Sequence, residues 1–186
     1  DFVSRNQDFP EIGNDVLMQY NKTKSGKFEE SKQKNIDNGT GLERVISVLN
    51  GYENTFEIDT LKPIYDKVKE LTKKKDFSDE EVRSLRIVTD HLRAAVMILG
   101  DDKAVAPSNV DQGYVLRKFI RRSIRHARLL GIGGNFCKSI AEIVIDVMKD
   151  PYIEVEKNKE FIFSELLKEE EKFSVALRKG MEIAKR

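Results

Sequence analysis

The pattern of apolar and polar positions along the chain changes near residue 41. Before it, residues 16–21 (VLMQYN) and residues 28–37 (FEESKQKNID) have the composition of strands, and they flank residues 22–27, where Ser25-Gly26 is a turn signal. The order of strand, turn and strand predicts an antiparallel β-hairpin. Because the second strand is very polar, we expect it to lie on an exposed or ligand-facing surface.

After residue 41 the apolar spacing becomes that of amphipathic helices. Pro63 is tolerated in the first turn of a helix. Ser78 with Glu81 three residues later forms a capping box, and the helix that it starts is expected to end at Gly100. The predicted helices are residues 42–49, 59–74, 78–99, a segment that ends near residue 131, 136–148 and 156–186.

These segments place the chain in the mainly α class, as a helical bundle preceded by a short antiparallel β segment. The length of 186 residues is sufficient for a buried core, and 39% hydrophobic with 35% charged residues excludes disorder as the main state. The longest apolar runs, such as residues 94–99, fall far short of the roughly 20 residues of a membrane helix, so no membrane partner is expected.

Two further features concern the origin of the chain. The sole cysteine, Cys137, can form no internal disulfide and provides no Cys/His cluster for a metal, which favours a reducing compartment and a cytoplasmic location. Residue 1 is Asp rather than Met, and we therefore expect the chain to be a piece of a longer protein. The sequence predicts no particular oligomeric state.

Charge is balanced overall and separated along the chain. There are 33 Lys and Arg against 32 Asp and Glu, yet residues 115–131 hold six cations and no acid, while residues 150–172 hold eight acids and four lysines. A one-sign positive helix face favours a nucleic-acid partner, and the alternative is that the acidic last helix neutralises it inside the fold. At about 100° per residue, one side of the basic helix carries Arg117, Arg121, Arg125 and Arg128, with Lys118 and Arg122 beside them.

Residues 37–44 (DNGTGLER) lie where the second strand gives way to the first helix. Glycines allow a ligand to approach the backbone, and the amides of a first helical turn can receive negative charge. Asp37 could accept hydrogen bonds from an ammonium group, and Arg44 could pair with phosphate oxygens. The alternative is a simple turn with a surface arginine. The dinucleotide fingerprint is excluded, because Arg44 stands where its third glycine would be.

The loop before the basic helix contains Pro107, Ser108 and Asn109. Its last residues can cap a helix, and capping is the simpler interpretation. Asn109 can also donate and accept hydrogen bonds, so it could read a base edge. His91 and His126 lie within helices, where a packed and hydrogen-bonded histidine is the expected state.

In these residues the chain resembles the alanyl-tRNA synthetases, a class II aminoacyl-tRNA synthetase family, over nearly its whole length. Residues 11–21 are similar to the family's strand after the second class II signature, and residues 35–44 are similar to its third signature, with DNGTGLER for the family's DTGMGLER. Residues 89–94, 107–109 and 113–126 are similar to its tRNA-recognition helices. Gly13 is a departure, because many members carry Trp there.

The resemblance implies that residues 1–52 are the last part of a class II catalytic domain and residues 53–186 a helical tRNA-recognition domain. It implies alanine and ATP with magnesium as substrates, the acceptor stem of tRNA(Ala) as partner, and no zinc in this part of the chain. The implied alanine-binding residues are Asn14, Asp37, Gly39 and Gly41. The implied ATP-binding residue is Arg44. The implied tRNA-binding residues are Asn109, which takes part in reading a G·U wobble pair, and Arg117, Lys118, Arg121, Arg122 and Arg125.

The implied reaction has two steps: alanine and ATP give alanyl-adenylate, and the alanyl group then passes to tRNA. Such catalysis depends on positioning and charge stabilisation, so no catalytic side chain is expected here. The first two signatures would precede residue 1, so we expect this fragment to be inactive alone. The alternative is a non-catalytic helical module that binds RNA or a protein.

Overall fold

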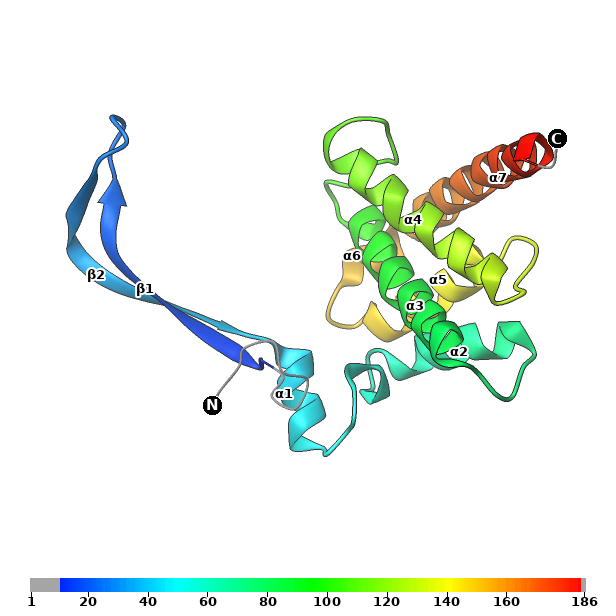
Figure 1. The fold of residues 1–186 in the computed structure, drawn as a ribbon, viewed down its shortest axis with the longest axis horizontal. Helices are drawn as coiled ribbons and strands as arrows, with labels where there is room; N and C mark the ends of the chain where they lie inside the picture. The colour runs from blue at the N-terminus through cyan, green and yellow to red at the C-terminus, as the bar shows by residue number, and fades with distance from the viewer. Residues whose placement is uncertain (1–10, 185–186) are drawn as a thin grey trace. The chain divides into compact units, whose positions relative to one another are not determined.

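The computed structural model describes residues 11–184, with side chains to residue 180, and divides at Ile58 into two compact units. The sequence-based domain boundary lies slightly earlier, after residue 52. The fold class is confirmed, since helices dominate and a short antiparallel ribbon precedes them (Figure 1). Within the described residues, no helix is long and apolar enough to cross a membrane.

The first unit contains the predicted hairpin. Strands β1 (Gly13–Lys22) and β2 (Phe28–Thr40) pair antiparallel, and β2 extends beyond the predicted end at residue 37. Gly26 closes the turn with φ of 84°, a left-handed conformation that favours glycine. The register shifts between Met18 and Tyr20. Helix α1 (Leu42–Leu49) and the short 3-10 helix η1 (Thr55–Glu57) follow.

No residue of the ribbon is buried. Every residue of β1 is exposed, and β2 is exposed apart from the half-buried Ser31. Leu17 and Ile36, which pair across the ribbon, retain 74% and 67% of their accessible surface. Since a two-stranded ribbon is marginal without a packed face, the pairing hydrogen bonds rather than a core define this part of the unit.

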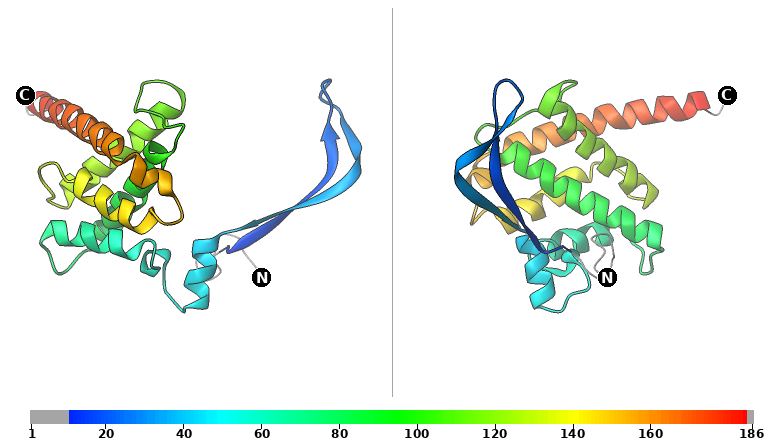
Figure 2. Two further views of the ribbon diagram at one scale, coloured as in Figure 1. Left: turned by 180° about the vertical axis from the view of Figure 1, so that it is seen from behind. Right: turned by 60° about the vertical axis from the view of Figure 1, so that its left-hand side comes forward.

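The second unit is a helical bundle formed by α2 (Lys62–Thr72), α3 (Asp79–Gly100), α4 (Asp111–Leu129), α5 (Cys137–Met148), α6 (Ile153–Lys157) and α7 (Lys159–Ala184). Helices α3 and α4 lie side by side in Figures 1 and 2. They run antiparallel, because Ser84 contacts His126 while His91 contacts Phe119. The fully buried large side chains of the core include Ile64, Leu85, Leu92, Leu99, Leu116, Ile120, Ile124, Ile140, Ile162 and Leu166.

Two helix starts are as predicted and one helix is not. Ser78 and Glu81 form the capping box of α3, and Pro63 lies in the first turn of α2. The continuous helix predicted from residue 156 is wrong, because α6 and α7 are separate and Asn158 lies between them. The side-chain amide of Asn158 donates to the carbonyl oxygen of Gly100 at 2.9 Å. This tertiary bond leaves no trace in the local apolar pattern.

Candidate functional site

A shallow recess of about 580 Å³ lies where the ribbon meets α1. Its lining includes four predicted site residues, namely Asn14, Gly39, Gly41 and Arg44. Strand register brings them together, since Asn14 pairs directly with Gly39. The amide of Gly41 donates to the carbonyl of Ile12 at 2.8 Å, which fixes the start of α1 against β1.

The glycines leave room for their neighbours in this recess. A Cβ atom on Gly39 would lie 3.2 Å from Oδ1 of Asn14, and one on Gly41 would lie 3.2 Å from Cδ of Arg44. Both distances are shorter than ordinary van der Waals contact. An alanine at either position would therefore displace one of the two polar side chains that line the recess.

Arg44 supplies the positive charge of the recess. Its Nη1 donates to the carbonyl oxygen of Glu11 at 2.7 Å, while the Glu11 carboxylate accepts from the amide of Asn14 at 2.9 Å. A guanidinium has five N–H donors, so further donors remain for phosphate oxygens. The first turn of α1 also favours negative charge. These groups are chemically able to bind a phosphate group.

Asp37 does not line the recess. It pairs with Val16, two positions along the ribbon from the pair of Asn14 and Gly39 and therefore on the same face as that pair. Alternate residues of a strand share a face, which puts Asp37 about 7 Å from Gly39 along β2. Its side chain is exposed. Asn14 and Arg44 thus line one recess, and Asp37 lies on the ribbon beside it.

The outward face of α4 carries three of the predicted tRNA-binding cations. Lys118, Arg122 and Arg125 are exposed, and Lys118 lies over the ring of Tyr114 at 5.4 Å. Val115 is 48% exposed beside them. This combination of cations and exposed ring or apolar surface is able to contact a phosphate backbone and the sugars next to it.

The other cations of α4 face α7. The Nε atoms of Arg117 and Arg121 lie 3.3 and 2.5 Å from a carboxylate oxygen of Glu169, whose side chain is 3% exposed. Arg128 donates to Oγ of Ser174 at 3.4 Å. The four arginines that share one side of the helical wheel therefore differ in their surroundings, since Arg117, Arg121 and Arg128 contact α7 while Arg125 is exposed. The acidic helix neutralises part of the basic one, as the alternative interpretation held, and only the outward part remains free for a ligand.

Asn109 does not cap α4, contrary to the simpler interpretation. The cap residue is Val110, which has no side-chain cap bond. Its backbone N–H donates to Oγ of Ser108 at 3.3 Å, and that hydroxyl donates to the carbonyl oxygen of Val110 at 2.9 Å. The Oδ1 atom of Asn109 accepts a hydrogen bond from Nη1 of Arg117. Asn109 is thus bonded to the basic helix nearly two turns beyond its start.

Glu170 is a buried carboxylate that the sequence interpretation missed. It accepts hydrogen bonds from the backbone amides of Phe136 and Cys137 at 3.1 and 3.2 Å, so it caps α5 from α7. Burial raises the pKa of Glu170 above its usual value, and burial together with this carboxylate raises the pKa of the Cys137 thiol. A signal existed, because Glu170 falls on the apolar stripe between Leu166 and Phe173.

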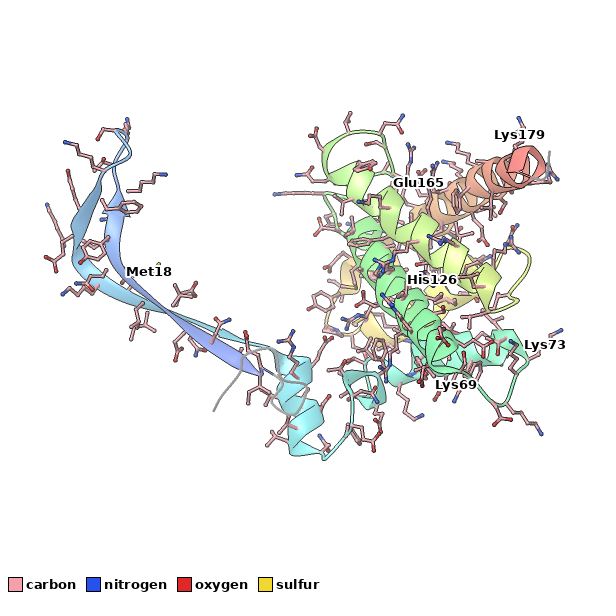
Figure 3. All side chains as sticks on the ribbon, in the orientation of Figure 1. Met18, Lys69, Lys73, His126, Glu165 and Lys179 are labelled. Atoms are coloured by element: carbon pink, nitrogen blue, oxygen red, sulfur yellow. The ribbon has the colours of Figure 1, made fainter. Side chains whose placement is uncertain are left out.

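Both histidines of the bundle are packed, as expected. His126 lies between α3 and α4 (Figure 3), with its Nδ1 3.0 Å from Oγ of Ser84. Burial, with help from Arg122 and Arg125, lowers the pKa of His126. A hydrogen bond from His91 at 2.9 Å lowers the pKa of Asp90. His126 therefore adds little to the positive charge of α4 near neutral pH.

No group of three or more His, Cys, Asp or Glu residues placed to hold a metal occurs in the part of the chain that the structure describes. Magnesium accompanies ATP in the implied reaction.

Comparison with known proteins shows the family to which the chain belongs. The family model described as tRNA synthetases class II (A) matches residues 2–186. The chain therefore belongs to the class II (A) tRNA synthetase family.

Within this family, the chain is similar to individual alanine-tRNA ligases. The alanine-tRNA ligase of Borrelia hermsii is 43% identical over 171 residues, which are 91% of this chain and 29% of the relative. That of Treponema pallidum is 43% identical over 173 residues, 92% of this chain and 29% of the relative. Alanine-tRNA ligase 1 of Lachnoclostridium phytofermentans is 41% identical over 176 residues, 94% of this chain and 20% of the relative.

These matches confirm the resemblance found in the sequence motifs. The chain spans less than a third of the length of the relatives that it matches. The activity of a whole ligase is therefore a separate question from the family of this chain.

Proposed function

We propose that this chain is the part of an alanine-tRNA ligase that binds the acceptor stem of tRNA(Ala) along α4. The outward cations Lys118, Arg122 and Arg125 carry the proposal, because they form a solvent-exposed positive face on a helix that is firmly packed on its other side. Phosphate contacts give affinity and register, whereas sequence is read at base edges. Asn109, in the loop that leads into α4, is the proposed reader of the third base pair.

The test is binding of the 186-residue chain to an acceptor-stem hairpin RNA that has either G·U or G·C at its third pair. We expect tighter binding of the G·U hairpin, and a fall in affinity with rising salt whose slope decreases by about one in Arg122→Ala. Lys172→Ala, an exposed cation on α7, is the matched control. Equal affinity for both hairpins would contradict base reading and leave a module that contacts phosphates only.

We further propose that the recess provides one side of the alanine and ATP pocket. Arg44 pairs with phosphate oxygens of ATP, and Asp37 accepts hydrogen bonds from the ammonium of alanine. Asn14 and the two glycines shape the space between them. Magnesium, when bound with ATP, neutralises phosphate charge. The role of the side chains is to bind and orient the two substrates so that the carboxylate of alanine meets the α-phosphorus.

Most of the recess residues are exposed, and those that the structure describes come from residues 11–14 and 39–44. Water reaches such a site, and charge stabilisation is weak where water screens it. We therefore propose that the chain alone does not make alanyl-adenylate. Alanine-dependent exchange of pyrophosphate into ATP is the measurement, and robust turnover by these 186 residues would refute this proposal.

We also propose a cytoplasmic location. The sole cysteine, Cys137, is free and buried, which fits a reducing compartment.

A further inference from the structure

The guanidinium group of Arg117 contacts other residues of the protein rather than solvent. Its side chain is 16% exposed. Nη2 donates to the carbonyl oxygen of Pro107 at 3.3 Å, and Nη1 donates to Oδ1 of Asn109. The Nε side lies 3.3 Å from the carboxylate of Glu169. One arginine thus connects α7 to two residues of the loop before α4.

These contacts decide which way the amide of Asn109 faces. Arginine has only donors, so the atom of Asn109 that meets it must be the oxygen. With Oδ1 engaged, the NH₂ group is the part of the amide that remains for a ligand. Asn109 is then a donor of hydrogen bonds, suited to acceptor atoms of RNA such as carbonyl oxygens, ring nitrogens or a 2′-hydroxyl.

Glu169 fixes the arginine in turn. Glu169 as a whole residue is 2% exposed, and its carboxylate contacts both Arg117 and Arg121. Arg117 therefore has a charged partner on the side opposite the loop. Ion pairs shielded from water are held more rigidly than exposed ones. The loop is tied to the start of α4 through Ser108, whose backbone N–H donates to the carbonyl oxygen of Gly113 at 3.0 Å, while the side chain of Asn109 is exposed.

We propose that Arg117, held by Glu169, is a positioning residue that fixes the side-chain amide of Asn109 with its NH₂ group toward RNA. Arg117 acts through Asn109 and does not itself contact RNA. This inference rests on the proposed function only for the identity of the ligand, since the orientation of the amide is a property of the free chain.

The first experiment needs no RNA. In the ¹⁵N-labelled chain, NMR relaxation of the Asn109 side-chain amide reports its mobility, and the signal is assigned by its loss in Asn109→Asp. We expect a restrained amide in the wild type and a mobile one in Arg117→Lys and in Glu169→Gln. Arg178→Lys and Glu171→Gln, which make the same changes at exposed positions of α7, are the controls. An amide that stays restrained in Arg117→Lys overturns the inference.

The second experiment links the amide to recognition. Arg117→Lys keeps the charge and loses the forked geometry, so we expect its preference for G·U over G·C hairpins to fall about 3- to 10-fold, the value of one hydrogen bond. In an Asn109→Ala background the same change should have no further effect. An equal loss in both backgrounds means that Arg117 acts independently of Asn109 and overturns the inference.

The two failures are distinguishable. A wild-type chain with no preference between the hairpins refutes the proposed function, and the mobility of the Asn109 amide then decides the positioning inference alone. Glu169→Gln provides the same readouts if Arg117→Lys fails to fold.

Discussion

In the ribbon, Asn14 and Gly39 are placed by strand register and by hydrogen bonds among exposed groups. In the bundle, Asn109 contacts Arg117, which in turn lies against the buried carboxylate of Glu169 on α7. A group held by a packed scaffold keeps its geometry against local opening, whereas one on an uncovered ribbon depends on whatever else contacts that ribbon. The contacts of Asn109 thus end in a buried side chain of the bundle, whereas those of Asn14 lie on a ribbon in which no residue is buried.

The largest expected effect comes from the core of the bundle. Leu92 is fully buried in α3, and Leu92→Ala should lower the free energy of unfolding by about 3 kcal/mol, because it removes buried methyl groups and leaves a cavity. Ile36→Ala in the ribbon should change it by less than about 0.5 kcal/mol. Urea unfolding followed by circular dichroism measures both. A costly Ile36→Ala would show that the ribbon is covered in solution.

Removing the carboxylate beneath α4 should have the next largest effect. Glu169→Ala leaves Arg117 and Arg121 without their shared partner, and we expect a loss of about 2 kcal/mol in the free energy of unfolding. Glu171→Ala, at an exposed position, should change little. Equal values for the two variants in urea unfolding would mean that Glu169 is not buried as described.

A smaller effect concerns pH. The pKa of Glu170 is raised in the folded chain by burial, so the folded state binds this proton more tightly than the unfolded state does. The corresponding stabilisation is present at acidic pH and is lost as the pH rises through the folded pKa. Relative to Glu170→Gln, the wild type should therefore become less stable from mildly acidic to neutral buffer. Parallel stability curves for the two chains would contradict this prediction.

The smallest effect on stability is expected at the surface of α4. Arg122 is exposed, and Arg122→Ala should alter the free energy of unfolding by no more than about 0.5 kcal/mol. The same substitution weakens RNA binding in the salt titration described above. A stability loss as large as that of Glu169→Ala would remove the distinction between the outward and inward cations.

The elements were predictable where local chemistry determines them. Helical spacing, the capping box of Ser78 and the turn at Gly26 each depend on residues close in sequence, and the structure confirms them. The break at Asn158 was not predictable, because the bond that stabilises it reaches a carbonyl at the end of α3. Gly100 was expected to end α3, and it is the last residue of that helix. In the structure a Cβ atom there would lie 3.1 Å from Val155, so a larger residue would press on the neighbouring helix α6.

In the candidate sites, too, features that depend on residues distant in sequence could not be predicted. Register could be inferred for a hairpin, and it brings Asn14 to Gly39. A helical wheel shows which cations share a face and does not show which side of that face another helix covers, so it could not separate Arg117 and Arg121 from Arg125. The roles assigned to individual site residues remain predictions.

The position of Cys137 gives this chain an internal reporter. Its thiol is fully buried at the start of α5, and its raised pKa keeps it protonated, while alkylating reagents attack the thiolate. Reaction therefore requires α5 to separate from α7, which exposes the sulfur and the carboxylate of Glu170 together. Since the chain has one cysteine, the rate at which a thiol reagent labels it measures the opening of this helix pair without any engineered probe.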